Sequence, residues 1–305
     1  MPEKNEIPML ESGIAIAPKL GGSFWFPVTW IGFVLVMAIC ADFMPLPHYG
    51  HIDWHHPAAS PGTTGQVVLL GHDGETLPTD FTYWLGTDAL GRDMVTRLIY
   101  GARVSLAVGL IAPAIALVLG GALGLLAGFY RGRFEAAVVA LMDVMLAFPG
   151  LILLLVVAFR FGSGLDRLIP ALSILAVPAF CRVARASTLT WAQRDFITAA
   201  RAVGAGDPRI ICCHLLPNVI FPLAAYGLMV VAVMIIAEGA MSFLGLGIPA
   251  PIPSWGGMIA EGKEVLNQAP HVSLAPAAVL FLTVLSFNLL GDRLRELTDV
   301  RQQIQ

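Results

Sequence analysis

The chain has 305 residues, of which 57% are hydrophobic and only 13% are charged, and its formal net charge at pH 7 is −3. Soluble domains carry about 25% charged residues, so this composition is typical of a protein that lipid surrounds. The small net charge argues against a nucleic-acid partner. Four scattered cysteines exclude a disulfide framework.

Six apolar segments approach or exceed the roughly 20 residues that a helix needs to cross a bilayer. They predict an all-α, polytopic membrane protein with six transmembrane helices at residues 22–42, 104–130, 136–159, 168–190, 218–244 and 272–291. The first begins too late and runs too long for a cleaved signal peptide, so we interpret it as a retained anchor. The fourth is the weakest, because Arg167 and Arg182 flank its short uncharged stretch and must reach toward the interfaces.

The distribution of lysine and arginine predicts the orientation in the membrane. Six spans place both termini on one side, and twelve of the 18 basic residues then lie on that side, against six on the other. Basic residues are enriched in cytoplasmic loops. We therefore expect a multi-pass protein of a bacterial inner membrane, whose tails 1–21 and 293–305 and whose polar segment 193–217 are cytoplasmic.

The extracytoplasmic segment 43–103 precedes a five-helix domain at residues 104–292. Proline, glycine and histidine are frequent in the first half of this segment, which predicts an irregular loop. Residues 88–101 are good helix formers and predict a short amphipathic helix at the membrane interface. A second outer segment, residues 245–271, contains the stretch IPAPIPSWGG, residues 248–257, whose prolines exclude a regular helix. We expect it to cover the outer mouth of the bundle.

The polar segment DFITAARAVGAGDPRIICCHLLPN, residues 195–218, connects the fourth and fifth spans. It predicts two short helices. Good helix formers precede a glycine-rich break at 204–206, and Asp207 and Pro208 are typical of the cap and the first position of a second helix. Connections in helix bundles are usually about 2–8 residues long. A helical connection of this length therefore indicates a rigid lever between two spans rather than an ordinary loop.

This segment resembles the cytoplasmic EAA loop of ABC-importer permeases, in which two alanines, a glycine and a Leu-Pro pair recur at fixed spacing. The matching positions are Ala199, Ala200, Gly204, Leu216 and Pro217. Two positions depart from the pattern, because Thr198 replaces the usual glutamate and His214 replaces a common isoleucine. The ending HLLPN is frequent in the subfamily that imports peptides and nickel.

Three further stretches, at residues 83–106, 142–150 and 238–259, resemble the C-type permeases of dipeptide, oligopeptide and nickel importers. The resemblance implies a type I importer permease that pairs with a homologous second permease, two cytoplasmic ATPase subunits and a periplasmic or lipid-anchored binding protein. It implies that ATP and magnesium bind to the ATPase subunits and that this chain holds no cofactor or metal. Peptides are the first substrate that it implies, and nickel and glutathione remain alternatives.

The resemblance also implies a mechanism of coupling. A helix at about residues 207–214 would seat in a groove of an ATPase subunit, so that closure of the ATPases tilts the fourth and fifth spans. The residues expected to couple are Ala199, Ala200, Gly204, Asp207, Arg209, His214, Leu216 and Pro217.

Two acidic residues are predicted at membrane depth, where ionisable groups face the bundle interior or water. For Asp143 we favour an ion pair with Arg131, Arg182 or Arg185 over a place on the transport pathway. For Glu238, pathway lining and a structural role are equally compatible with the sequence.

Other clusters favour structural interpretations. Gly120, Gly124 and Gly128 recur every four residues, which allows close helix packing, and we favour packing within the bundle over contact with the second permease. Adjacent Cys212 and Cys213 point about 100° apart on a helix and cannot readily share a metal. The histidines of the outer segment favour a solvated loop over a metal site; they are His48, His51, His55, His56 and His72.

Catalytic motifs do not emerge from the sequence. Residues 257–263 have the G-x4-G-K spacing of a phosphate loop, but no strand precedes them and the predicted topology places them outside. We therefore expect a non-catalytic permease. An ion-coupled secondary transporter is the rival class, and it would need intramembrane proton or sodium sites, for which the sequence offers only Asp143 and Glu238.

Overall fold

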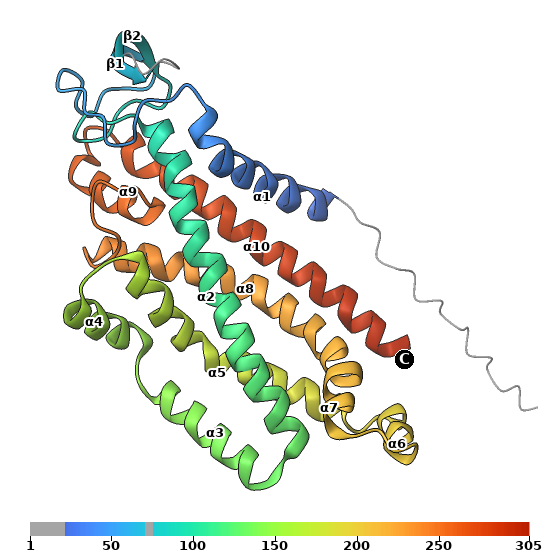
Figure 1. Cartoon of the computed structure of the whole chain (residues 1–305). Coiled ribbons are helices and arrows are strands. Elements are labelled where there is room, and N and C mark those ends of the chain that lie inside the picture. The colour runs from blue at the N-terminus through green and yellow to red at the C-terminus, as the bar shows by residue number, and fades with distance from the viewer. Residues whose placement is uncertain (1–21, 71–75, 305) are drawn as a thin grey trace, which may run out of the picture.

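A computed structural model of the chain describes residues 22–70 and 76–304, and the predicted tail 1–21 and His72 lie outside them. Long helices dominate the described part and run along a common direction (Figure 1). A two-stranded antiparallel sheet lies at one end of this bundle, and two short helices lie at the other (Figure 1). We call these the hairpin end and the elbow end.

Most connections between the elements are short, and the longest is residues 44–62, between η1 and β1. In chain order they are α1 (Gly22–Cys40), η1 (Ala41–Phe43), β1 (Thr63–Leu70), β2 (Thr76–Tyr83), α2 (Met94–Tyr130), α3 (Gly132–Ala147), α4 (Gly150–Phe161), α5 (Leu165–Trp191), α6 (Asp195–Ala202), α7 (Asp207–Ile210), η2 (Ile211–Leu215), α8 (Leu216–Phe243), α9 (Trp255–Gly262), η3 (Lys263–Val265) and α10 (His271–Ile304). Five helices of the described part are long and apolar enough to cross a bilayer, and α3 with α4 makes a sixth span if the bent pair counts as one.

The third span is not the single helix that its hydropathy predicts. It divides into α3 and α4, whose axes differ by 76°. The cause lies at Phe148 and Pro149. Proline disfavours the helical conformation in the residue before it, and Phe148 is accordingly extended, with φ −84° and ψ 128°. The apolar run is long enough to span, but its backbone is broken.

The second span begins earlier than predicted. The expected interfacial helix at 88–101 is not separate, because α2 starts at Met94 and continues for 37 residues to Tyr130. Asp93 caps this helix, since its carboxylate accepts hydrogen bonds from the amide and hydroxyl of Thr96, at 2.8 and 2.6 Å. An aspartate at the N-cap position is a strong signal for the start of a helix.

The first half of the outer segment is also more regular than predicted. Strands β1 and β2 pair antiparallel from Thr63 opposite Tyr83 to Leu70 opposite Thr76. Below the hairpin, the Tyr83 hydroxyl donates to the Asp53 carboxylate at 3.0 Å. Burial raises the pKa of the Tyr83 phenol, and the neighbouring carboxylate raises it further, so the phenol stays protonated as a donor.

Helix α2 runs through the middle of the bundle and packs most closely on α5. Gly120, Gly124 and Gly128 face α5 so tightly that an added Cβ at Gly124 would overlap the carbonyl oxygen of Cys181, and one at Gly128 would lie 2.8 Å from the Thr188 Cβ. The prediction that these glycines pack within the bundle is confirmed. Without a hydrophobic driving force in lipid, such close backbone contact is a main source of helix association.

Two apolar clusters form the core. One joins α2, α5 and α8 with parts of α3 and α4 and with α6, α7 and η2, and the other joins α1, α2, α8, α9 and α10. Trp255 of α9 is completely buried in the second cluster, and its indole donates to the Leu98 carbonyl of α2 at 3.0 Å. Residues 248–254 are not helical, as predicted, but the last three residues of the stretch 248–257 are, because α9 begins at Trp255, after the last proline.

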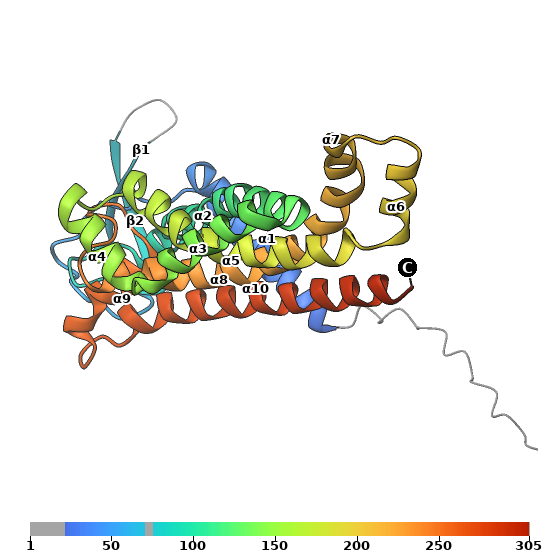
Figure 2. The same cartoon turned by 90° about the horizontal axis from the view of Figure 1, so that it is seen from below.

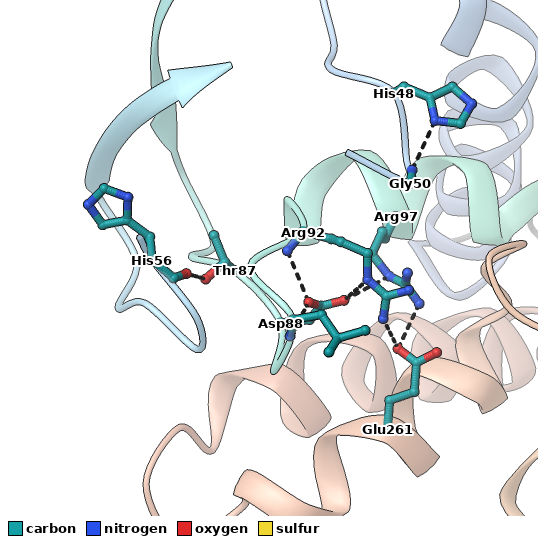
Figure 3. Close-up of polar contacts among 9 residues, drawn as sticks. His48, Gly50, His56, Thr87, Asp88, Arg92, Arg97 and Glu261 are labelled. Atoms are coloured by element: carbon teal, nitrogen blue, oxygen red, sulfur yellow. Dashed lines mark hydrogen bonds and ion pairs between the residues drawn. The ribbon is translucent and has the colours of Figure 1, made fainter. Parts of the chain in front are cut away.

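A buried ion cluster fastens α9 to the start of α2 at the hairpin end (Figure 3). The Glu261 carboxylate of α9 lies 2.6 Å from Arg92 and 2.8 Å from Arg97. Asp88 pairs with the same two arginines, at 2.6 and 3.3 Å. The side chains of Arg92, Arg97 and Asp88 are almost fully buried, so each of these charges depends on the others for compensation.

The glycine contacts generate a stability prediction. Gly124→Ala should destabilise the protein by about 1–3 kcal/mol, because its methyl group must push α2 away from the α5 backbone. Gly121→Ala is the matched control, since its Cβ would meet only the Leu223 Cδ1, at 3.5 Å. The thermal unfolding midpoint in detergent should fall for the first variant only. Equal midpoints would contradict the close approach of these helices.

The ion cluster generates a second prediction. Arg97→Met leaves Asp88 and Glu261 with Arg92 alone, and we expect a loss of about 3 kcal/mol, at the low end for a broken buried pair. Arg293→Met breaks the exposed pair with Glu296 and should leave the unfolding midpoint unchanged. A similar midpoint for both variants in thermal unfolding would argue against a compensated cluster.

Candidate functional site

The segment 195–218, which we call the elbow, projects from the bundle at the end opposite the hairpin (Figure 2). It contains α6, a turn at residues 203–206, α7 and the π-helical turn η2, which leads directly into α8. Only residues 192–194 separate α6 from the end of α5. The predicted pair of short helices is confirmed, and the elbow is joined to both spans with little slack.

Gly204 ends α6 in a left-handed conformation, with φ +85°. Its amide donates to the Arg201 carbonyl, and the amide of Ala205 donates to the Ala200 carbonyl, each at 3.0 Å. These two bonds form a Schellman motif, which closes the helix and turns the chain. A side chain at Gly204 would meet no atom within 4 Å, so glycine is required here by backbone conformation and not by space.

The start of α7 differs by one residue from the prediction. Gly206 is the N-terminal cap residue, and no side chain hydrogen bonds to the helix start. Asp207 and Pro208 therefore occupy the first and second helical positions instead of the cap and the first. Asp207 still stabilises the helix start, because its negative charge lies near the positive end of the peptide dipoles.

One face of the elbow is fixed in the bundle core by apolar side chains. Ile197 of α6, Ile210 of α7 and Leu215 of η2 are all 1% exposed or less. The Arg201 guanidinium lies over the ring of Phe129 at the end of α2, 5.4 Å from its centroid. These anchors tie the elbow to the core rather than leaving it as a free loop.

The opposite face of the elbow is open. Val203, at the turn, is 86% exposed. Of the eight predicted coupling residues, six are exposed and two half-buried: Ala199, Gly204, Asp207, Arg209, Leu216 and Pro217 are exposed, and Ala200 and His214 are half-buried. By element, the eight residues are Ala199 and Ala200 of α6, Gly204 of the turn, Asp207 and Arg209 of α7, His214 of η2, and Leu216 and Pro217 at the start of α8.

A hollow of about 560 Å³ lies beside the elbow. Its lining comes from the end of α5, the start of α6 and the η2–α8 junction, and comprises Trp191, Arg194, Asp195, Phe196, Cys213, His214 and Asn218. Of these, the sequence singled out His214 as a coupling residue. The Arg194 guanidinium lies 5.5 Å from the centroid of the Trp191 ring, so one wall combines an aromatic surface with a positive charge.

The two predicted intramembrane acids have different surroundings. Asp143 of α3 pairs with Arg182 of α5 at 2.7 Å, which confirms the favoured ion pair. Glu238 of α8 is completely buried and accepts hydrogen bonds from the hydroxyls of Ser242 at 2.7 Å and Ser105 at 3.2 Å. Because Ser105 lies on α2, the carboxyl of Glu238 joins α8 to α2, which supports its structural alternative.

The outer histidines have local contacts. The His56 Nδ1 lies 2.8 Å from the Asp53 carboxylate, and the His48 Nδ1 accepts from the amide of Gly50 at 3.1 Å. Among residues 22–70 and 76–304, no three histidine, cysteine or acidic side chains are placed to hold a metal ion. The described histidines therefore give no support to a nickel site.

A helical membrane bundle with a two-helix elbow between its fourth and fifth spans is the arrangement that the resemblance to ABC-importer permeases implies. Comparison with known families agrees with this class. The chain belongs to the family described as binding-protein-dependent transport system inner membrane component, whose family model matches residues 116–303. The resemblance seen in the sequence is thus confirmed.

Close relatives fall in the same branch. The chain is 41% identical over 217 residues to the glutathione transport system permease protein GsiD of Pectobacterium atrosepticum, which covers 71% of this chain and 72% of the relative. The GsiD proteins of Escherichia coli O157:H7 and Shigella sonnei are 43% identical over the same shares. The solved methionine ABC transporter MetNI, in an inward-facing conformation, shares the fold, with TM-score 0.56, 21% identity, and coverage of 67% of this chain and 97% of that chain.

The turn at Gly204 generates a third prediction. Gly204→Ala should strain the elbow by about 1–2 kcal/mol, because alanine disfavours the left-handed conformation. Gly206→Ala is the control, since Gly206 has φ −71° and its Cβ would meet nothing closer than the Pro208 Cδ at 3.9 Å. Trypsin should cleave at the exposed Arg201 and Arg209 faster in the first variant. Unchanged cleavage would show that the turn does not need glycine.

Proposed function

We propose that the elbow is the part of this permease that receives a cytoplasmic ATPase subunit and transmits its movement to the spans. The observation that supports it best is the two-sided character of the elbow. Ile197, Ile210 and Leu215 anchor one face in the core. The other face is exposed, and it carries one acidic side chain, Asp207, and one basic side chain, Arg209. A surface that is rigidly held yet uncovered is what a force-bearing contact requires.

The connections of the elbow favour transmission over flexing. Residues of the elbow continue into α8 through η2 without a non-helical break, and α5 ends at Trp191, close to the start of α6. A displacement of α7 therefore acts on α8 directly and on α5 through a short link. The tilt of these two spans relative to the second permease would change access to the pathway.

This proposal assigns sides to the membrane. The elbow, the C-terminal end of α10 and the N-terminus would be cytoplasmic, and the hairpin with α9 would face the periplasm or cell exterior. The excess of arginine near the elbow end supports this orientation. The partners would be a homologous second permease, two ATPase subunits that bind ATP and magnesium, and a binding protein that delivers substrate on the hairpin side.

We further propose that the transported solute is a short peptide or a peptide-like molecule. The support comes from relatives at 41–43% identity that are named glutathione permeases, since glutathione is itself a small peptide. Such solutes carry an ammonium group and at least one carboxylate at neutral pH. A pathway for them needs polar contacts that tolerate both charges.

A charge reversal on the elbow tests the proposal. Arg209→Glu should abolish co-purification of the ATPase subunits with the importer, because the exposed guanidinium would be replaced by a carboxylate on the docking face. Arg133→Glu is the matched control: it makes the same charge change on an exposed residue at the start of α3, outside the elbow. Pull-down of the complex with a tag on this chain measures both.

The outcome separates two explanations. If both variants retain the ATPases equally, the elbow is not the docking site. If both lose them, the effect is one of overall charge at this end of the bundle and not of the elbow. Substrate-stimulated ATP hydrolysis in proteoliposomes should follow the pull-down, falling only for Arg209→Glu.

A further inference from the structure

The ion pair between Asp143 and Arg182 has an unusual position. Its two side chains are 57% and 59% exposed, although each lies within a membrane-spanning segment. Asp143 lies eleven residues along α3 from Gly132, and Arg182 lies nine residues before Trp191, the end of α5. At 1.5 Å per residue the pair is about 14–17 Å from these helix ends, and α5, with 27 residues, is about 40 Å long, so Arg182 lies in the half of this span nearer the elbow end.

Lipid is a poor environment for such a pair. Ionised side chains inside the hydrocarbon core are costly, and charged residues there usually face protein or water. A long side chain such as that of Arg182 can reach toward the interface, whereas the short carboxyl of Asp143 stays close to the backbone of α3. More than half of the pair is left uncovered by this chain, so water or another protein must cover it.

The two flanks of the seam between α3 and α5 differ in character. Small side chains accompany the ion pair at helical spacing, with Ala136, Ala140 and Ala147 beside Asp143, and Ala179 and Ala186 beside Arg182. On the other side of α3 the exposed side chains are large and apolar, as at Leu141, which is 54% exposed, and Phe134, which is 44% exposed. Leu146, one turn from Asp143, is 43% exposed as well, so the flank with the ion pair carries fewer large apolar side chains than the other flank but is not without them.

We propose that the flank with Asp143 and Arg182 lines the water-filled pathway between this chain and the second permease, and that the ion pair binds the charged ends of the passing peptide. The Arg182 guanidinium would bind the substrate carboxylate in a bidentate fashion, and the Asp143 carboxylate would bind the ammonium group. This inference rests on the proposed function and adds the contact site for its substrate.

The strength of the pair agrees with this role. A solvent-exposed ion pair contributes only about 0–1 kcal/mol, so substrate charges can exchange with it at small cost. The second ion pair on the same seam, between Glu135 and Arg185, is more covered, with side chains 19% and 36% exposed. The pair of Glu135 and Arg185 lies nearer the elbow end and holds α3 to α5. The pair of Asp143 and Arg182 can therefore separate without loss of that contact.

The position of the flank can be tested by cysteine labelling in proteoliposomes that contain the complete importer. Ala140→Cys places a thiol beside the intact ion pair, and Leu141→Cys places one at the same depth on the apolar flank. Both are made with the exposed Cys212 and Cys213 changed to serine. The probe is a membrane-impermeant, anionic methanethiosulfonate, which reacts with thiolates in water.

We expect the thiol at position 140 to react at least about tenfold faster than the thiol at 141, with or without nucleotide, because thiolates persist only where water enters. A tripeptide substrate supplied with binding protein should slow this reaction. Equal, slow reaction at both positions in nucleotide-free and vanadate-trapped importer would overturn the inference. Fast reaction at 140 without protection by peptide would overturn the substrate contact.

A charge-neutral variant tests the contact itself. Asp143→Asn retains a hydrogen-bond acceptor for Arg182 but loses the negative charge, so it should lower peptide uptake at least about tenfold while the unfolding midpoint stays unchanged. A pair that only joins α3 to α5 would leave uptake near its original rate. Since co-purification of the ATPases does not depend on Asp143, its persistence distinguishes failure of this inference from failure of the coupling proposal.

Discussion

The close contact between the backbones of α2 and α5 is the constraint on which the rest of the structure depends. In lipid, helices gain no hydrophobic free energy by associating, so they are held by packing and by polar contacts. Gly120, Gly124 and Gly128 permit that packing along more than two turns of α2. Because α2 extends from the hairpin end to the elbow end, it gives α5 a fixed support (Figure 1). The transmission of force that we propose for the elbow would require α5 and α8 to rest on this support.

Much of this arrangement could be predicted from the sequence, because the signals were local. The spans follow from apolar length, and the elbow turn follows from Gly204, whose left-handed conformation closes α6. The predictions that were wrong followed hydropathy alone, whereas in the molecule a local signal decides where the helix breaks or begins. Pro149 breaks the third span although its flanks are apolar, and Asp93 starts α2 ten residues before the predicted boundary. The hairpin was missed because its strands lie in a segment rich in turn-forming residues.

The polar contacts could be predicted only in outline, because they join residues far apart in the chain. The sequence offered three arginines as partners for Asp143, and the fold selects Arg182 by bringing the facing surfaces of α3 and α5 together. For Glu238 the sequence offered no partner, yet the fold supplies Ser105 from α2 and Ser242 one turn along α8. The hollow beside the elbow is different, because its lining residues, from α5, α6, η2 and α8, all lie within residues 191–218.

The serine contacts of Glu238 limit how the bundle can respond to a push at the elbow. Glu238 lies 22 residues from Leu216, where α8 begins, which corresponds to about 33 Å along the helix axis. Each degree by which α8 pivots at its base would displace this carboxyl by roughly 0.6 Å, whereas a hydrogen bond tolerates only a few tenths of an ångström. Rotation beyond a degree must therefore carry α2 along. The permease would swing as a block, with little sliding between its own helices, and the relative motion would fall at its boundary with neighbouring subunits.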